Sequence, residues 1–574
     1  MTSQENESST GRWLRSALPI LKWFPQYQRD WLRFDILAGV TLAAYAVPVS
    51  LAYASLAGLP PQAGLYCYLL GGLAYVAFGT SRQLAIGPTS AISILIGASL
   101  AGLAAGDTGR LSSLAMAVAV LAGAIGIVAW ALRLGNIVNF VSETILSGFK
   151  TGAGLVIAST QLPKLFGISS GGNNFFTRII DIARHLPETN LPTLGVGLGA
   201  LALLILGERF LPRRPIALFV VIISILVMSF FPLAAHGVKT VGTIPQGFPH
   251  IGWPLVHWHD ADDLLPLAMA CFLLSYVESI SVVRTFGLKH GYPVSADQEL
   301  LALGMANLAA GVGQAYPLAG GMSQSAVNEK AGAKTPLALV FASISLGVVL
   351  LFLTGFMSNL PQPVLAAVVL IAVGGLIKPK ELWHLSKVSK LEFRVAMVAT
   401  VGVLLFGILK GVLLAAIFSI LILLKRATRP RIIPLGRLAG SDRFVDTSRY
   451  PDSEISPNVL VLRIESGLFY FNAENVRAEV MRNVEERAHT KLVVLDLSTS
   501  PNIDLAGVHM FAALRDQLAK SGVALNLAQV HGDVRDFLQA EGLQTQIRGI
   551  EQRLRVAALI ELWKQESPQL TTRA

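Results

Sequence analysis

Charged residues and cysteine are both scarce in this chain. Asp, Glu, Lys and Arg make up 14% of the 574 residues, whereas soluble proteins carry roughly a quarter. Apolar residues make up 53%. The two cysteines, Cys67 and Cys271, lie in apolar segments, so neither a disulfide framework nor a zinc site is indicated. The composition predicts an integral membrane protein over most of the length.

Other features that the sequence lacks narrow its function. Residues 1–19 are polar and have no apolar stretch like that of a signal peptide. No nucleophile–base pair is apparent, so we expect neither an enzyme nor a cofactor. We also expect no metal site, because one group of histidines lacks cysteines and tight spacing: His236, His250, His257 and His259. The net charge of +10 is better explained by basic cytoplasmic loops than by nucleic acid.

The charge that is present is unevenly distributed. It is sparse from Asp35 to Leu424 and ordinary beyond that point. The chain therefore divides into an N-terminal cytoplasmic segment (1–34), a membrane domain (35–428), a basic linker (429–456), a soluble α/β domain (457–565) and a tail (566–574). In the α/β domain we predict strands at 459–464, 491–495 and 523–527, alternating with helices at 474–488, 505–519, 532–540 and 550–564.

Apolar segments recur through the membrane domain. We predict fourteen, two of them short, at 35–56, 64–78, 83–100, 111–132, 137–160, 191–207, 215–234, 264–283, 300–314, 320–333, 337–356, 363–377, 391–409 and 411–427. Fourteen divides into seven plus seven, and an odd-numbered repeat places its two copies in opposite orientations. Lys and Arg are more frequent in the loops that share a side with the termini. This bias predicts cytoplasmic termini in the cell (inner) membrane.

The stretch 316–335, YPLAGGMSQSAVNEKAGAKT, interrupts a very apolar region. Pro317 breaks a helix, and the adjacent Gly320 and Gly321 let one backbone approach another. The pattern predicts a short extended piece followed by a half-helix that begins near Ser323 and Gln324. Such a half-helix presents unpaired N–H groups and a partial positive charge inside the membrane.

A matching stretch, SRQLAIGPTSAISILIGASL, lies at 81–100. We predict an extended piece at 83–86, then a second half-helix with Pro88 in its first turn and the hydroxyls of Thr89 and Ser90 beside it. Transporters often hold a substrate between two such broken helices. Two facing N-termini predict an anion site, although small residues in membranes also serve simply to pack helices closely.

Glu278 stands alone in the apolar segment LAMACFLLSYVESISVV. A carboxylate inside a membrane segment costs about 2.5–3.5 kcal/mol on insertion scales, which makes it a functional candidate. The alternative is a glutamate that reaches the cytoplasmic interface or pairs with Arg284. Two half-helix ends supply about one positive charge in total. An ionised Glu278 cancels that charge and a protonated one restores it, so we predict that proton and anion bind together.

Two side chains complete the predicted site. Tyr53 follows Pro48, which implies a kink or break in the first segment; its ring would line the site or simply pack. Gln324 would act as a neutral hydrogen-bond donor. With Glu278 as the proton-coupling group, the predicted substrate-binding residues are Tyr53, Thr89, Ser90, Gly321, Ser323 and Gln324.

Four of these stretches together resemble the SulP anion-transporter family, which includes sulfate permeases, the solute carrier 26 exchangers and prestin. They are PVSLAYASLAGLPPQAGLY, SRQLAIGPTSAIS, YVESISVVRTF and GMSQSAVNEKAGAKT. The resemblance implies two inverted repeats, with segments 1–4 and 8–11 moving as an elevator against segments 5–7 and 12–14, and a homodimer in the lipid bilayer. It also implies that the anion lies between segments 3 and 10, at Tyr53, Thr89, Ser90 and Ser323, with Glu278 as the coupling carboxylate.

Two departures from the family pattern bear on mechanism. Many relatives carry arginine where this chain has Gln324, so the site lacks a fixed cation there. Attraction of the anion therefore depends more strongly on protonation of Glu278. Sodium-coupled bicarbonate relatives carry aspartate at the Glu278 position and threonine one turn later. Because Val282 stands in that later place, we expect no sodium site.

The terminal region resembles a STAS domain, similar to bacterial anti-sigma-factor antagonists, through VVLDLSTSPNIDLAGVHMF. In those proteins a phosphorylated serine precedes the glycine of this motif. Ala506 stands there in this chain, so we expect no phosphorylation at that position. A cytoplasmic partner of the domain is expected, and the sequence leaves its identity open.

The favoured function is proton-coupled transport of a small anion. Sulfate is the favoured substrate. A transporter of dicarboxylate or bicarbonate would show the same sequence features. The alternatives are uncoupled anion exchange or conductance, a nucleobase permease, and a membrane-tethered signalling scaffold. The STAS-like region argues against the nucleobase permease.

Overall fold

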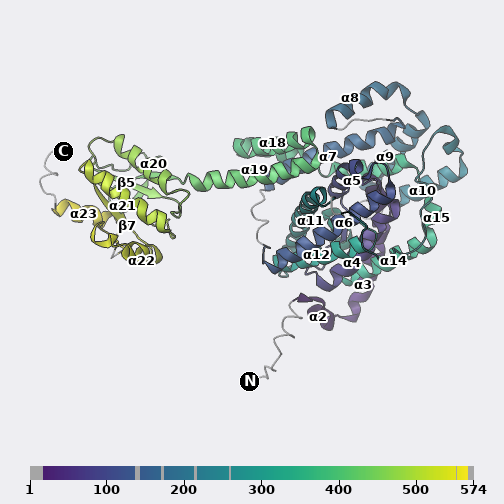
Figure 1. Ribbon diagram of the computed structural model, residues 1–574, viewed down its shortest axis with the longest axis horizontal. Coiled ribbons are helices and arrows are strands. Elements are labelled where there is room, and N and C mark those ends of the chain that lie inside the picture. The colour runs from purple at the N-terminus through teal and green to yellow at the C-terminus, as the bar shows by residue number, and fades with distance from the viewer. Residues whose placement is uncertain are drawn as a thin grey trace, which may run out of the picture. The chain divides into compact units, whose positions relative to one another are not determined.

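Helices dominate the first of the two units into which the chain divides, Met1–Ser419 and Ile420–Ala574 (Figure 1). The computed structural model describes residues 17–135, 143–169, 174–211, 216–257, 260–550 and 553–566. Several predictions fall outside these ranges: residues 1–16 of the N-terminal segment, the start of segment 137–160, His259, and the tail from residue 567 onward.

The first unit contains one very short two-stranded sheet among its helices. The strands are β1 (Ile86–Gly87) and β2 (Ala319–Gly320). The helices are α2 (Ile20–Trp23), α3 (Leu32–Leu56), α4 (Pro61–Phe78), α5 (Ser90–Ala104), α6 (Thr108–Ala131), α7 (Glu143–Phe166), α8 (Phe175–His185), α9 (Leu191–Phe210), α10 (Ile216–Phe230), α11 (Ala261–His290), α12 (Ala296–Val312), α13 (Met322–Lys330), α14 (Leu337–Val348), α15 (Thr354–Met357), α16 (Gln362–Gly374), α17 (Pro379–Val388) and α18 (Lys390–Phe406). Helix α19 (Ile408–Thr428) begins in the first unit and ends in the second.

Each of the fourteen predicted apolar segments overlaps one of these helices. Among the described residues, six helices are long and apolar enough to cross a membrane: Arg29–Leu56, Thr108–Ala131, Leu191–Phe210, Ala261–His290, Leu337–Met357 and Gln362–Val388. Two shorter apolar helices, α5 and α10, accompany them. How many segments cross a bilayer stays a prediction. Pro48 does not break the first segment, because α3 continues through it to Leu56.

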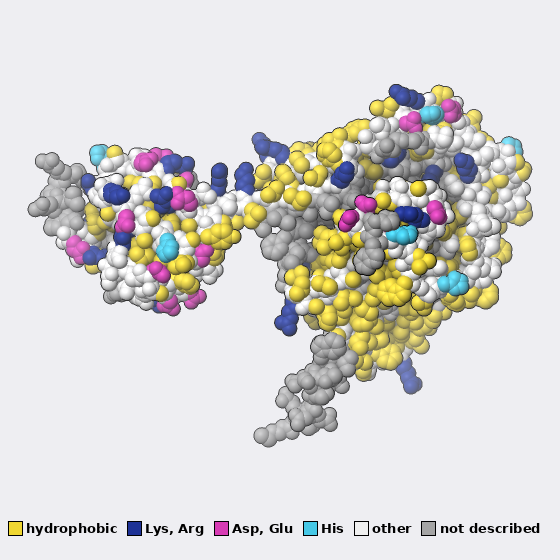
Figure 2. Space-filling model, viewed as in Figure 1, with side chains coloured by type: hydrophobic (Ala, Val, Ile, Leu, Met, Phe, Trp, Pro, Cys, Tyr) yellow, Lys and Arg dark blue, Asp and Glu magenta, His cyan; other side chains and the backbone are white. Residues whose placement is uncertain are grey.

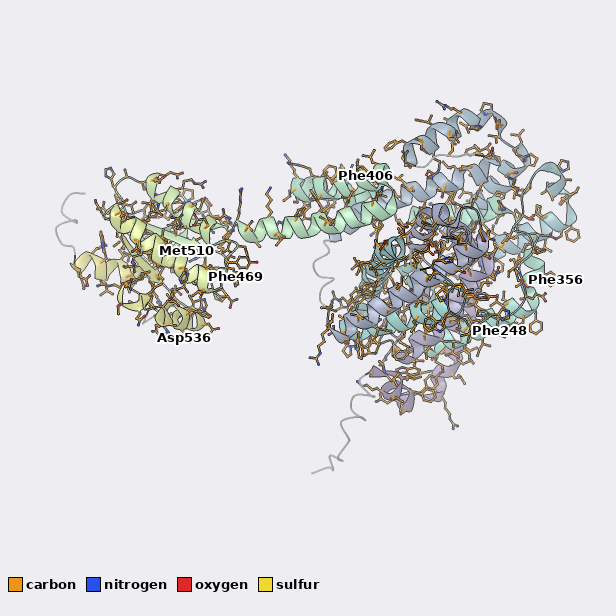
Figure 3. All side chains as sticks on the ribbon, in the orientation of Figure 1. Phe248, Phe356, Phe406, Phe469, Met510 and Asp536 are labelled. Carbon is orange, nitrogen blue, oxygen red and sulfur yellow. The ribbon has the colours of Figure 1, made fainter. Side chains whose placement is uncertain are left out.

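Apolar side chains cover much of the face of the first unit that Figure 2 shows. Phe248, Phe356 and Phe406, labelled in Figure 3, are 53%, 70% and 58% exposed. In water, large exposed apolar surfaces mark an interface or a membrane. Together with the apolar helices, this surface fits a protein surrounded by lipid.

The helices of the first unit pack into two bundles. The first bundle contains α3–α6 and α11–α14, and the second contains α7–α10 and α16–α18. Small residues allow the closest crossings in the first bundle. A Cβ atom added at Gly39 of α3 would come within 2.5 Å of the Ala338 carbonyl oxygen of α14, so glycine is required there. The bundles meet where α3 and α5 pack against α7, α10 and α16.

Asp35 is a fully buried carboxylate that fixes the connection between α13 and α14 to the start of α3. It accepts hydrogen bonds from the backbone N–H groups of Lys334 and Thr335, at 2.7 and 3.1 Å, and from the Thr335 hydroxyl at 2.7 Å. The Tyr27 hydroxyl donates a fourth bond at 3.2 Å. Burial and the Asp35 carboxylate raise the pKa of Tyr27 to about 12, so its phenol remains a donor.

Replacing this acceptor should destabilise the first bundle. We expect Asp35→Ala to lower the free energy of unfolding by about 3 kcal/mol, because buried donors left without a partner cost roughly 1–3 kcal/mol each. Thermal melting of the purified protein measures the loss. Asp30→Ala is the matched control, since Asp30 is exposed. Equal melting temperatures for the two variants would contradict the structural role of Asp35.

The second unit is a five-stranded sheet with helices on both faces (Figure 1). Its strands lie in the order β4-β3-β5-β6-β7, with β5, β6 and β7 parallel and β3 and β4 antiparallel to their neighbours. They are β3 (Ile432–Arg437), β4 (Phe444–Asp446), β5 (Val459–Ile464), β6 (Leu492–Asp496) and β7 (Ala524–Ala528). The helices are α20 (Ala473–Glu485), α21 (Leu505–Lys520), α22 (Gly532–Ala540) and α23 (Val556–Glu566).

The helices are placed by the alternation of apolar side chains along β5. Leu460 and Leu462 pack against α20, α21 and α22, whereas Val459 and Val461 pack against α23. The sequence predicts a linker at residues 429–456. The structure instead places β3 and β4 in this segment. Pro434 and Gly436 within β3 hide the usual strand pattern, because both residue types are uncommon in strands.

Candidate functional site

Two helices of the first bundle begin inside it, each directly after one strand of the β1–β2 pair. The strands are antiparallel, with Ile86 opposite Gly320 and Gly87 opposite Ala319. Helix α5 follows β1 with Thr89 as its N-cap, and α13 follows β2 with Gly321 as its N-cap. The predicted interruptions of both segments are therefore confirmed, and the strand pairing brings the two breaks together.

The local sequence explains this geometry, with one correction. Pro88 lies before the N-cap of α5 rather than in its first turn, because the chain is still leaving β1 at that point. The strand pair also needs a residue without a side chain. A Cβ atom added at Gly87 would come within 2.5 Å of the Tyr68 ring of α4.

The second strand is anchored by two neighbouring helices. The side-chain amide of Asn307 in α12 accepts from Leu318 N–H at 3.0 Å and donates to the Leu318 carbonyl at 3.2 Å. From α11, Ser279 accepts from Gly320 N–H at 2.7 Å and Ser275 donates to the Leu318 carbonyl at 2.7 Å. These bonds satisfy backbone groups that no regular helix partner could reach, and they hold the start of α13 in place.

Gln324 joins the two interrupted segments. Its Oε1 accepts a hydrogen bond from the Tyr68 hydroxyl. Its Nε2 donates to the carbonyl oxygens of Ala85, at 3.0 Å, and Ala319, at 3.2 Å, one from each segment. Both amide hydrogens are thus engaged by the protein, and the side chain is buried.

Hydroxyl groups surround the two helix N-termini. Thr89 and Ser90 at the start of α5 are 9% and 7% exposed, whereas Ser323 at the start of α13 is exposed. Two tyrosines of α3 reach these ends: the Tyr45 hydroxyl lies near Ser323, and the Tyr53 hydroxyl lies near Ser90. Thr89 Oγ1 is buried, and the Glu278 carboxylate is the group that lies near it.

Glu278 lies on the side of α11 that meets the strand pair. Ser275 and Ser279 of the same helix bind β2, and residues three or four apart share a helix face. The Glu278 carboxylate lies near the Thr89 hydroxyl and within electrostatic reach of Lys150 on α7. A carboxylate, unpaired N–H groups and several hydroxyls therefore gather at one place.

The model of the sulfate permease family matches residues 32–399, which include every side chain described at this site. The chain belongs to the sulfate permease family. A second model, that of the STAS domain, matches residues 450–557 and thus the second unit.

Curated sulfate permease relatives extend the match to nearly the full length. The chain is 34% identical over 525 residues to "Probable sulfate transporter Rv1739c" of Mycobacterium tuberculosis, covering 91% of this chain and 94% of the relative. It is 31% identical over 573 residues to "Sulfate transporter 2.2" of Arabidopsis thaliana, covering 93% and 83%. These relatives and the family support transport of an anion.

Solved structures of related transporters share the fold. The murine Solute Carrier 26 family member A9 anion transporter, in an inward-facing state, is 25% identical with a TM-score of 0.88, covering 98% of this chain and 96% of that one. The transmembrane domain of the cyanobacterial bicarbonate transporter BicA is 22% identical with a TM-score of 0.60, covering 69% and 98%. This permease is accordingly a multi-pass membrane protein with a STAS domain.

Two residues at the permease site were missed by sequence reasoning. Tyr45 lies eight residues before Tyr53 on α3, and only the fold shows that the two tyrosines reach different helix ends. Lys150 is a lone cation in an apolar segment. The rule that singled out Glu278 applies equally to it, so the sequence did carry a signal for this residue.

Proposed function

We propose that this protein is a secondary active transporter that carries a small anion, sulfate first, together with protons. The observation that supports the proposal most is the meeting of two helix N-termini at paired strands, beside the hydroxyls of Thr89, Ser90 and Ser323. Each N-terminus carries about half a positive charge and several free N–H groups. Oxyanions bind readily at such ends.

The proposed binding residues are those predicted from the sequence, with Tyr45 added. Thr89, Ser90 and Ser323 would donate hydroxyl hydrogens to the anion, and the backbone N–H groups beyond Thr89 and Gly321 would complete its coordination. Tyr45 and Tyr53 would orient the serine hydroxyls of α13 and α5. Gln324 is proposed to act through its contacts with both strands.

Glu278 is proposed to couple the anion to a proton. Ionised, its charge offsets the two helix ends, and an anion near Thr89 would meet a carboxylate. Protonated, it removes that repulsion and can donate a hydrogen bond. Each of the two ligands, proton and anion, then binds more tightly when the other is bound. This mutual effect is what couples two binding sites. Dicarboxylate and bicarbonate would satisfy the same site.

The wider arrangement of the transporter is also a proposal. The bias of Lys and Arg in the loops supports cytoplasmic termini in the cell membrane. The first bundle would move as an elevator against the second, with a homodimer as the assembly. The STAS domain would then lie in the cytoplasm and bind a partner there.

Uptake into liposomes tests the proposed function. We expect purified protein to accumulate labelled sulfate, and an inward proton gradient to raise the initial rate about tenfold, because a proton coupled by about 1.4 kcal/mol changes binding by that factor. Bicarbonate and fumarate are measured in parallel to set the substrate order. A flux that is electrogenic and independent of pH would instead favour uncoupled conductance.

A further inference from the structure

Lys150 on α7 faces the protein interior rather than lipid. Gly148 and Gly152 of the same helix contact α18, where a Cβ atom added at Gly152 would come within 2.8 Å of the Thr400 carbonyl oxygen. Lys150 lies two residues from each, so its side chain leaves the helix on the opposite side. On that side Ile157, two turns further along, is fully buried.

The Lys150 ammonium has no close counter-ion within the described part of the chain. It is half-buried, and among the described residues no carboxylate lies within the 4 Å of an ion pair. It remains within electrostatic reach of Glu278 on α11, across the contact between α7 and α5. By contrast, Lys164 in the last turn of α7 donates a hydrogen bond to Ser55 Oγ at 3.0 Å. An intramembrane charge without a structural partner is expected to serve function.

We propose that Lys150 is the fixed cation of the anion site and makes it selective for divalent oxyanions. This inference rests on the proposed function. The two helix ends supply about one positive charge, and Lys150 adds a second. With Glu278 protonated, the total of about two matches sulfate or a dicarboxylate. With Glu278 ionised, about one remains, which suits a monovalent anion better.

Other titratable groups near the site do not change this balance. Tyr45 and Tyr53 contribute phenol hydroxyls that lie near Ser323 and Ser90. Glu208 of α9 is a carboxylate near the Tyr45 side of the site, but it is exposed, so water and salt screen its charge. Lys150 therefore supplies the cation that is absent at Gln324. Because Lys150 belongs to the second bundle, it attracts an anion held by the first.

The expected effect follows from Coulomb's law. The attraction of Lys150 for a divalent anion is twice that for a monovalent anion at the same place. We expect Lys150→Gln to raise the KM for sulfate about a hundredfold and the KM for bicarbonate about tenfold, so that the ratio of the two changes about tenfold. Lys150→Arg retains the charge and should keep the ratio within about twofold of the wild type.

The experiment measures both KM values for the full-length chain in liposomes. Lys164→Gln is the matched control, since it removes a lysine from the same helix about 21 Å along its axis and should leave the ratio unchanged. An unchanged ratio in Lys150→Gln, or an equal change in Lys164→Gln, would overturn the proposal. If Lys150→Gln does not fold as judged by size-exclusion chromatography, Lys150→Met gives the same comparison with an uncharged side chain of similar length.

A binding measurement separates the two proposals. Sulfate should raise the Tm of the wild type and of Lys150→Arg, and this rise should be largely lost in Lys150→Gln. A wild type that transports none of the tested anions would refute the proposed function. A wild type that transports sulfate, with a Lys150→Gln variant of the same selectivity and the same sulfate-induced rise, would refute only the role of Lys150.

Discussion

Replacing Glu278 by glutamine should leave anion binding in place and remove its dependence on protons. Glutamine has the shape of the protonated carboxyl group and cannot ionise, so the charge near Thr89 becomes constant. We expect the roughly tenfold stimulation of sulfate uptake by an inward proton gradient to be lost, which is a change within the range of coupling between two binding sites. Exchange of sulfate against sulfate, which needs no net proton movement, should persist.

Glu299→Gln is the matched control for this prediction. Glu299 is also a buried carboxylate in the first bundle, but its oxygens already accept hydrogen bonds from the Tyr75 hydroxyl, at 2.9 Å, and from Thr80 N–H, at 2.8 Å. Its replacement should lower the Tm and leave the proton stimulation of the surviving protein intact. Proton-driven uptake that persists in Glu278→Gln would exclude Glu278 as the coupling group.

The interruption of two helices could be predicted because the residues that cause it act locally. Pro88 and Pro317 cannot continue a helix, and Gly320 and Gly321 permit close backbone contact. The strand register could not be predicted, since strands of two residues carry no periodic pattern. It is set by contacts from distant helices, such as that of Asn307 with Leu318.

The same difference between local sequence and long-range contacts decides which side chains of the site could be predicted. Thr89, Ser90 and Ser323 adjoin the breaks, so their position follows from the sequence. Tyr45 reaches the site only through the crossing of α3 with α13, and Lys150 reaches it only where the two bundles meet. Contacts between separate elements depend on packing that no local pattern records. Strand β3 was missed for a related reason, because its identity depends on its pairing with β4 and β5.

Replacing Gln324 should also have a large effect on stability and transport. The role predicted for Gln324 from the sequence and the contacts that it makes in the structure predict different effects of its replacement. As a direct ligand it would bind the anion. In the structure, its amide instead connects Ala85 of one interrupted segment to Ala319 of the other, and it accepts a hydrogen bond from the Tyr68 hydroxyl. Gln324→Met preserves the length of the side chain and removes all three hydrogen bonds.

We expect Gln324→Met to lower the free energy of unfolding by about 3–5 kcal/mol, since it leaves two buried carbonyl groups and a phenol without partners. Transport should fall more than about a hundredfold, because the two helix ends lose the bridge that holds them at a common distance from the anion. Thermal melting without substrate and sulfate uptake are measured on the same preparation. A raised KM with an unchanged Tm would instead mean that Gln324 contacts the anion directly, as predicted from the sequence. Ser323→Ala serves as the control for a direct ligand: its hydroxyl is exposed at the site, so its loss should raise the KM and leave the Tm almost unchanged.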